Sequence, residues 1–233
     1  MPQREGKLGL KRVSIFAELS DAALEGVAQS CTWRNYAAGE QILAYQDPST
    51  DVAFLLAGKA RVIIYSSEGK AVVFVDLKPG GMFGEIAAID RKPRSASIEA
   101  LEPCHIASLS ADKFETLMLR EPSIAVATLR HMTEHVRRLS ERIFEFSTLL
   151  VQNRIHAELL RLAGETGQRH TETLLSPAPS LSDIADRIST HREAVSRELA
   201  RLAGIGVLRR EGDDLRIINV AKLAKLVDEA KGD

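Results

Sequence analysis

Short apolar runs separated by glycine-containing turns fill the chain from Trp33 to about Leu109. The runs at 62–65 and 72–75 are rich in β-branched and aromatic residues, and a polar turn over 66–71 lies between them. Such residues favour a pleated surface, and two strands joined by a short polar turn form a hairpin. Repeated short strands of this kind predict a small β-sandwich or barrel.

The spacing of apolar residues changes from strand-like to helical after Ser110. A short helical stretch runs to Arg120, and Pro122 is well placed to open a longer helix. Apolar residues then recur at alternating spacings of three and four, as in the a/d seam of a coiled coil. They are Leu129, Met132, Val136, Leu139, Ile143, Phe146 and Leu150. Three uninterrupted heptads predict a dimer interface at these positions up to Phe146, the alternative being a helix face that packs on the chain's own strands.

The last third of the chain has the helix lengths and helix-breaking residues of a helix-turn-helix. Helical spacing continues to about Ala163, and the polar, proline-containing stretch over 164–179 predicts a loop. Ser180 can cap a helix that ends near Ile188, and a second helix is expected over 191–203. The segments at 207–210 and 215–218 bracket a turn over 211–214, which predicts a two-stranded wing.

The second of these helices has a face suited to reading DNA. Val195, Leu199 and Leu202 share the opposite face and can pack on the first helix. An arginine can donate two parallel hydrogen bonds to guanine, and a carboxylate can accept one from cytosine. The candidate DNA contacts are Ser182, His191, Arg192, Glu193, Ser196 and Arg197. Arg187 and Arg201 lie close to this face and add to its positive charge, and Arg209 and Arg210 on the wing are available for phosphates.

A purely structural interpretation of the same helix remains open. Thr190 and Glu193 have the spacing of a capping box, and Glu193 with Arg197 has the i,i+4 spacing of an ion pair. The net charge of −1 does not favour nucleic acid either. The DNA hypothesis therefore rests on local residues.

Composition limits the function classes. At 233 residues with 45% hydrophobic content, the chain can form two domains with real cores. No apolar run approaches the roughly 20 residues that span a bilayer, and the basic segment Met1–Arg12 does not resemble a signal peptide. We therefore expect a cytoplasmic protein with no membrane partner.

Metal and enzyme chemistry find little support in the sequence. Cys31 and Cys104 lack the spacing of a structural zinc site. His131 and His135 are four residues apart on the long helix, but the sequence offers no third ligand, so we expect a solvated helix face and no metal. No nucleophile elbow, Walker loop or pair of catalytic carboxylates is recognisable, and we expect no enzymatic activity.

A second constellation suits a phosphorylated nucleoside. The segment Phe83–Ala87 reads F-G-E-I-A, and Arg94, Ser95 and Ala96 follow it. A glycine turn that enters a helix exposes backbone N–H groups to an anion, and an arginine supplies paired donors. Glu85 repels phosphate and suits a hydroxyl such as the ribose 2′-OH. The bland alternative is a Glu85–Arg94 ion pair beside a glycine turn.

Four features of the sequence resemble one family in their order and spacing. They are the G-E-I-A…R-S-A cassette, the glycine-spaced strands, the long helix and the R-E-A-V-S-R segment. They are similar to the cyclic-AMP receptor protein branch of the CRP/FNR regulators, over nearly the whole chain. The resemblance implies an α+β fold with three parts. These are a jelly-roll-like cyclic-nucleotide-binding β-roll over 1–121, a dimerisation helix and hinge over 122–150, and a winged helix-turn-helix over 151–233.

The resemblance also implies a ligand, cyclic AMP or cyclic GMP. Glu85 would bind the ribose hydroxyl, and Arg94 and Ser95 the cyclic phosphate. The other implied pocket residues are Gly84, Ile86 and Ala96 in the cassette, with Val62, Phe74, Val75 and Phe83 as walls. In the receptor branch a threonine and a serine of the dimer helix meet adenine, but here those positions hold Leu139 and Ser140. The missing threonine keeps both nucleotides open.

As a function, the resemblance implies a ligand-gated homodimer that binds a palindrome with TGTGA-like half-sites and works with RNA polymerase. Two alternatives remain. One is a regulator of the same fold that senses another ligand, such as an organic acid or a haem bound by Cys104 and His105. The other is a nucleotide-binding regulatory subunit that controls a partner enzyme and does not bind DNA.

Overall fold

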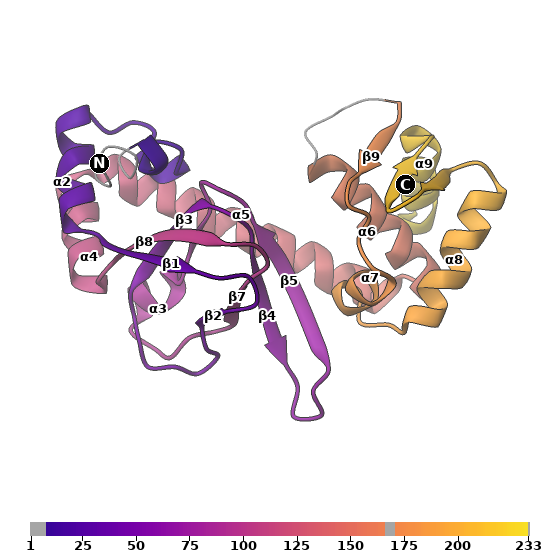
Figure 1. The fold of residues 1–233 in the computed structure, drawn as a ribbon, viewed down its shortest axis with the longest axis horizontal. Coiled ribbons are helices and arrows are strands. Elements are labelled where there is room, and N and C mark those ends of the chain that lie inside the picture. Colours follow the sequence, from indigo (N-terminus) through magenta and orange to yellow (C-terminus); the bar gives the residue numbers. More distant parts are fainter. Residues whose placement is uncertain (1–7, 166–170, 233) are drawn as a thin grey trace. The chain divides into compact units, whose positions relative to one another are not determined.

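The computed structural model describes residues 8–165 and 171–232. Residues 1–7 of the basic N-terminus and 166–170 of the predicted loop lie outside this description. The chain forms two compact units, Met1–Val136 and Arg137–Asp233 (Figure 1). The boundary lies within the long helix α5, Pro122–Thr148, whose proline start was predicted. The three-part division stays a prediction.

Two antiparallel four-stranded sheets form the N-terminal unit, in agreement with the predicted β-roll. One sheet has the order β1 (Thr32–Tyr36), β8 (Cys104–Leu109), β3 (Val52–Ala57), β6 (Met82–Phe83). The other has the order β2 (Gln41–Leu43), β7 (Ser97–Ala100), β4 (Ala60–Tyr65), β5 (Ala71–Leu77). Because every strand pair is antiparallel, short turns suffice to join many of them.

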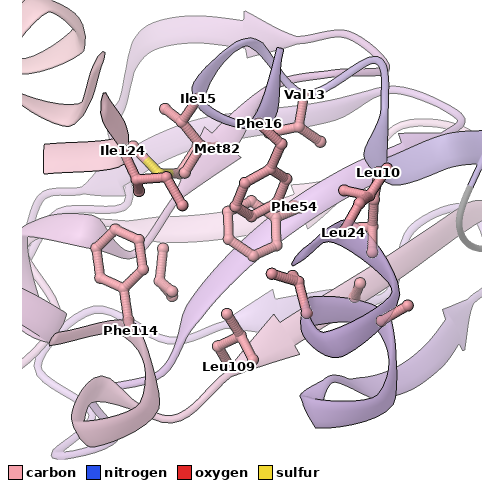
Figure 2. Packing of buried hydrophobic residues seen from close by; sticks show 14 of the residues in the cluster. Leu10, Val13, Ile15, Phe16, Leu24, Phe54, Met82, Leu109, Phe114 and Ile124 are labelled. Carbon is pink, nitrogen blue, oxygen red and sulfur yellow. The ribbon is translucent and has the colours of Figure 1, made fainter. Parts of the chain in front are cut away.

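Strand β3 is buried on both faces, which explains its unbroken run of apolar residues. Since side chains alternate along a strand, Ala53 and Leu55 join the core between the sheets. Phe54 and Leu56 face the other way, into a second core shared with the helices. In that core Phe16 meets Phe54 edge to face at 4.9 Å between ring centroids (Figure 2).

The helices of this unit include two that were not predicted from the sequence. The short 3-10 helix η1 (Ser14–Phe16) precedes α2 (Asp21–Ser30), and neither was predicted. Ser20 caps α2 by accepting a hydrogen bond from the backbone N–H of Ala23. The predicted short helices are present as α3 (Glu85–Asp90) and α4 (Ala111–Arg120).

The C-terminal unit contains the predicted helix-turn-helix and wing. Its helices after α5 are α6 (Val151–Glu165), α7 (Leu181–Arg187), α8 (Arg192–Gly204) and α9 (Val220–Lys231). Its strands form one sheet in the order β10 (Leu208–Glu211), β11 (Asp214–Ile217), β9 (Thr173–Leu175). Val195 and Leu202 of α8 share one buried core with Ile184 and Ile188, as expected.

Three predictions for this unit need correction. The stretch over 164–179 is not all loop, because α6 continues to Glu165 and β9 pairs with β11. The wing turn is shorter than 211–214, since Glu211 pairs with Asp214 and leaves a two-residue turn that begins at Gly212 with a φ of 62°. Helix α9 was not predicted, and it buries Leu223 and Val227.

No helix within the described ranges is both long and apolar enough to cross a lipid bilayer.

Candidate nucleotide pocket and DNA-reading helix

Gly84 fixes the geometry of the predicted phosphate cassette at the start of α3. Its φ of 78° lies in the left-handed region, which favours glycine. A Cβ at this position would lie 2.6 Å from Nη1 of Arg94 and 2.8 Å from the carbonyl oxygen of Asp51. Only glycine therefore lets three groups come this close. They are the backbone of Asp51 just before strand β3, the turn that enters α3 and the Arg94 guanidinium.

The Arg94 guanidinium is buried and held in place by the protein itself. Its Nε donates to Oγ of Ser49 at 3.0 Å. Its Nη1 donates to the carbonyl oxygens of Asp51 at 2.8 Å and Gly84 at 3.1 Å. Burial lowers the pKa of Arg94, while the nearby carboxylates of Asp51, Asp47 and Glu85 act in the opposite direction. An arginine fixed in this way is preorganised for an anion.

The predicted pocket walls do not all come together. Phe83 is buried between the sheets, and Val62 and Val75 pack against the same cluster. The β4–β5 register shifts by one residue after Val62, so that Val62 pairs with Val75 and Ile63 with Val73. Phe74 is the extra residue of this bulge, and its exposed fraction is 42%. The structure therefore groups three of the four predicted wall residues.

The remaining cassette positions differ in exposure. Glu85 is buried and begins α3, whereas Ile86 is exposed at 38%. Ser95 is exposed and Ala96 half-buried, immediately after the buried Arg94. The hydroxyl of Ser95 is thus accessible to solvent. Ser95 directly follows Arg94, whose guanidinium is held by hydrogen bonds inside the protein.

Helix α8 presents the predicted reading face to solvent. Its N-cap is His191, which makes no side-chain capping bond, so the capping box expected from Thr190 is wrong. Glu193 lies 3.9 Å from Nε of its neighbour Arg192, rather than forming the expected pair with Arg197. A hollow of about 410 Å³ is lined by Leu181, Arg192, Glu193, Ser196 and Arg197. Ser182 is exposed on α7.

Two family models match this chain, one for each unit. The cyclic nucleotide-binding domain matches residues 33–121, and the Crp-like helix-turn-helix domain matches residues 153–226. The chain belongs to the CRP/FNR family. Both matched domains, in this order, are what the sequence patterns led us to expect.

Individual relatives agree with this assignment. The CRP-like cAMP-activated global transcriptional regulator of Mycobacterium tuberculosis is 24% identical over 217 residues, which cover 93% of this chain and 97% of the relative. A solved CooA variant from Carboxydothermus hydrogenoformans has a TM-score of 0.77 at 18% identity, covering 92% of this chain and 94% of its own. The c-di-GMP responsive regulator CLP of Xanthomonas campestris has a TM-score of 0.73 at 19% identity, covering 85% and 99%. The two solved structures support the fold alone.

In this CRP/FNR regulator, the predicted dimer seam on α5 is largely exposed. The exposed fractions are 67% for Leu129, 60% for Val136, 48% for Leu139 and 66% for Ile143. Phe146 is exposed at 37% and Met132 is half-buried. Ser140 beside Leu139 is also exposed. Apolar side chains exposed at heptad spacing are typical of a helix that meets another copy of itself.

Several arginines of the predicted basic face and wing are already engaged. Arg187 was expected on the basic face, but it is buried and lies 3.2 Å from Oδ2 of Asp183. Arg201 donates to both carboxylate oxygens of Glu198. Arg209 donates to Glu211. The side chain of Arg210 makes one long contact, 3.4 Å from its Nε to the carbonyl oxygen of Gly212.

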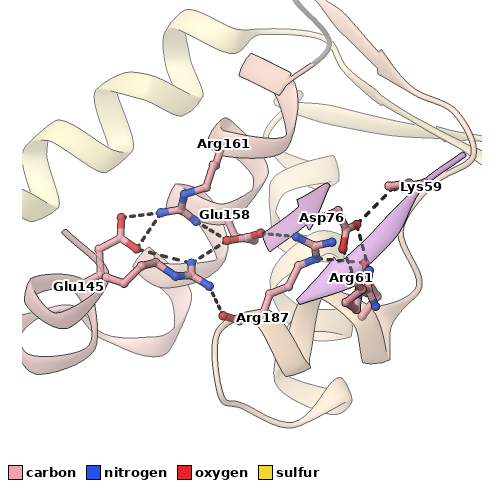
Figure 3. Close-up of polar contacts among 9 residues, drawn as sticks. Lys59, Arg61, Asp76, Glu145, Glu158, Arg161 and Arg187 are labelled. Atoms are coloured by element: carbon pink, nitrogen blue, oxygen red, sulfur yellow. Dashed lines mark hydrogen bonds and ion pairs between the residues drawn. The ribbon is translucent and has the colours of Figure 1, made fainter. Parts of the chain in front are cut away.

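A buried ionic network that sequence reasoning missed joins α5, α6 and α7 in the C-terminal unit (Figure 3). Glu158 accepts from Arg142 at 2.8 Å and from Arg161, and Arg187 lies 3.6 Å from its other oxygen. Glu145 accepts from Arg161 at 2.9 Å. Burial lowers the pKa of Arg161, but Glu158 and Glu145 more than offset this and raise it above its ordinary value. The sequence signals were the i,i+3 spacings of Arg142–Glu145 and Glu158–Arg161 and the i,i+4 spacing of Asp183–Arg187.

The wing carries a pH-sensitive contact. Arg216 and Arg209 donate to Glu211 and lower its pKa from 4.5 to about 2. Because the folded-state pKa is depressed, the contact stabilises the wing above pH 4.5, and this stabilisation is lost as the pH falls towards 2. We expect Glu211→Gln to melt at a lower temperature than the wild type at pH 7, with the difference closing near pH 2.

Circular dichroism melts at pH 7, 4 and 2.5 measure this difference. Glu229→Gln is the matched control, because Glu229 is an exposed glutamate that lies 3.7 Å from Lys225. A melting difference between Glu211→Gln and wild type that stays constant with pH would contradict the prediction.

Proposed function

We propose that this chain is a transcription regulator that binds palindromic DNA as a homodimer when a cyclic nucleotide occupies its β-roll. The observation that carries the proposal is the buried Arg94, fixed by three hydrogen bonds beside Gly84 and Glu85. A guanidinium so placed suits the singly charged phosphate of a cyclic nucleotide.

Each polar group of the cassette has a proposed role. Arg94 and Ser95 bind the cyclic phosphate, and Glu85 accepts the ribose 2′-OH. Gly84, Ile86 and Ala96 contribute backbone contacts. Phe83, Val62 and Val75 form the apolar wall, whereas the exposed Phe74 closes over a ligand only if the β4–β5 hairpin moves. Relatives that are named cAMP-activated support this class of ligand.

Leu139 does not distinguish between adenine and guanine as the base of the ligand. A leucine offers no hydrogen bond at the position where the receptor branch has a threonine, while Ser140 of the partner copy keeps one hydroxyl. Cyclic AMP and cyclic GMP are therefore both proposed effectors. No metal is part of this proposed function, and no step of it is enzymatic.

The DNA half of the proposal rests on the exposed face of α8. Arg192, Glu193 and Arg197 read base edges, supported by Ser182, His191 and Ser196. Dimerisation along the α5 seam gives two reading helices, whose half-sites are expected about 34–36 Å apart on the DNA. We propose TGTGA-like half-sites. With DNA and RNA polymerase as proposed partners, we expect the protein to act in the cytoplasm.

The ligand gates DNA binding through linkage, because the proposed dimer has a form that binds DNA and a form that does not. A nucleotide shifts the population only through tighter binding to the DNA-competent form. Leu139 belongs to the proposed dimer seam and Ser140 lies beside it, so a base that meets them would bias how the two α5 helices pair.

Arg94→Leu tests the ligand site by calorimetric titration with cyclic AMP and cyclic GMP. We expect the wild type to bind at least one of them and the variant to bind about 10- to 100-fold more weakly, since a hydrogen bond to a charged group contributes about 1.5–3 kcal/mol. Arg91→Ala is the matched control, because Arg91 is an arginine of the same segment whose contacts are Asp112 and Glu115.

The competing functions give different results in the same experiments. A gel shift on a TGTGA-type palindrome is run with and without nucleotide. DNA binding without any nucleotide binding would favour a same-fold regulator with another ligand. Nucleotide binding without DNA binding would favour a regulatory subunit of an enzyme.

A further inference from the structure

A carboxylate and two imidazoles meet in the N-terminal unit. Glu85 begins α3, while His131 and His135 lie one turn apart on α5. Oε1 of Glu85 lies 3.5 Å from Nδ1 of His135 and 3.9 Å from Nε2 of His131. One ligand atom from each residue lies within 4.8 Å of the other two. In the sequence this histidine pair has no recognisable third ligand, and the fold supplies one.

The burial of this cluster favours a cation. The side chain of Glu85 is 4% exposed, against 18% for His131 and 23% for His135. A buried carboxylate favours a cation close by. The two rings lie 4.2 Å apart, so one ion beside the carboxylate can meet a nitrogen of each.

The distances are close to those of a metal site. Zinc binds imidazole nitrogen and carboxylate oxygen at about 2.0–2.2 Å, which sets tetrahedral ligand atoms roughly 3.4 Å apart. The Glu85–His135 distance already has this value, and small side-chain rotations bring His131 closer. His131 also lines a hollow of about 250 Å³ together with Glu18, Arg130 and Glu134.

We propose that Glu85, His131 and His135 bind a divalent transition-metal ion of the zinc class, with the fourth coordination position open. Two imidazoles and one carboxylate are a ligand set typical of such ions. The site stands on this geometry alone. Its consequence rests on the proposed function, because Glu85 is also the carboxylate assigned to the ribose hydroxyl. A carboxylate bound to metal is no longer available for that hydroxyl, so metal and cyclic nucleotide compete.

Zinc titration of the metal-free, tag-free full chain tests the site. We expect one Zn²⁺ per chain by calorimetry, and a Co²⁺ complex with visible absorption bands of a low-coordinate nitrogen and oxygen site. His131→Ala, His135→Ala and Glu85→Gln should each weaken Zn²⁺ binding by more than about 10-fold, since loss of even an outer-shell partner costs about 10–100-fold. His105→Ala and His191→Ala are the matched controls and should bind as the wild type does.

Folding of the variants is followed in the same samples. Zn²⁺ should raise the melting temperature of the wild type and the controls by mass action, and should leave that of the three ligand variants unchanged. Glu85→Asp keeps a carboxylate and should retain the Co²⁺ bands that Glu85→Gln loses. No stoichiometric Zn²⁺ binding, or binding that survives both histidine substitutions, would overturn the proposal.

Competition is measured by titrating cyclic AMP and cyclic GMP with and without saturating Zn²⁺. We expect the apparent nucleotide affinity to fall at least about 10-fold when the metal site is filled, because both ligands need Glu85. Simultaneous binding at unchanged affinity would overturn the competition. Zn²⁺ binding by a chain that binds neither nucleotide would support the metal site and count against the proposed ligand.

Discussion

Glu158→Gln is expected to lower the free energy of unfolding of the C-terminal unit by about 3–5 kcal/mol, the usual cost of removing one partner from a buried ion pair. The side chain of Glu158 is 2% exposed, and its two oxygens lie within ion-pair distance of Arg142, Arg161 and Arg187. Glutamine has the same shape without the charge. The three guanidiniums would then share Glu145 and Asp183 as their remaining carboxylates in this network.

Urea unfolding followed by circular dichroism gives the free energy, with the slope checked for a change in the denatured state. Glu229→Gln removes an exposed i,i+4 pair of the same unit and should cost no more than about 0.5 kcal/mol. Because buried charges are poorly screened, the Glu158→Gln loss should persist in 1 M salt. A loss below about 1 kcal/mol would show that the network contributes little to the stability of this unit.

The buried ionic network also connects the end of α5 to the helix-turn-helix, which concerns the proposed gating by ligand. Arg142 and Glu145 belong to the last turns of α5, and Arg142 donates to the backbone carbonyl of Arg187 at the end of α7. The end of the proposed dimer helix is therefore bonded to the first helix of the helix-turn-helix within one unit. Rotation of this segment of α5 would carry α7, and with it the reading helix, as one body. This coupling is what the proposed ligand gating requires.

Periodicity predicted the elements that carry long, regular patterns. The α5 heptads up to Phe146, the β4–β5 hairpin and the α7–α8 pair occur where spacing placed them, whereas Leu150 lies beyond the end of α5 at Thr148. Strand β9 was missed because it has three residues, and its strand state depends on pairing with β11. Tertiary pairing of this kind leaves no local pattern in so short a segment.

The candidate site was predictable as a set of residue types but not as a set of contacts. Gly84, Glu85 and Arg94 are near one another in sequence, and their chemistry suggested an anion site. The approach of His131 and His135 to Glu85 joins α3 to α5 across a long stretch of chain, so no spacing rule could find it. The same holds for Arg187, which was expected on the basic face near the reading helix and is instead buried against Glu158.

Arg197→Ala is expected to remove most sequence-specific DNA binding, on the proposed function. A bidentate contact between arginine and guanine contributes about 1–3 kcal/mol of base discrimination, and a homodimer on a palindrome makes the contact twice. The combined loss of about 2–6 kcal/mol corresponds to a fall in specific affinity of about 30-fold to more than about 10⁴-fold. Since Arg197 is exposed on α8 and lines the open hollow, the substitution should leave the unfolding free energy within about 0.5 kcal/mol of wild type.

Fluorescence anisotropy on a TGTGA-type palindrome and on a scrambled duplex measures both affinities across a range of salt. Arg197→Lys is the sharpest control, because it keeps the charge but not the two parallel donors, and should lose discrimination while retaining binding to scrambled DNA. Arg210→Ala should do the opposite: a wing arginine on a phosphate weakens both duplexes equally and reduces the salt slope by about 1 per contact. If Arg197→Ala weakens both duplexes to the same extent, α8 contributes charge to DNA binding but does not read its sequence.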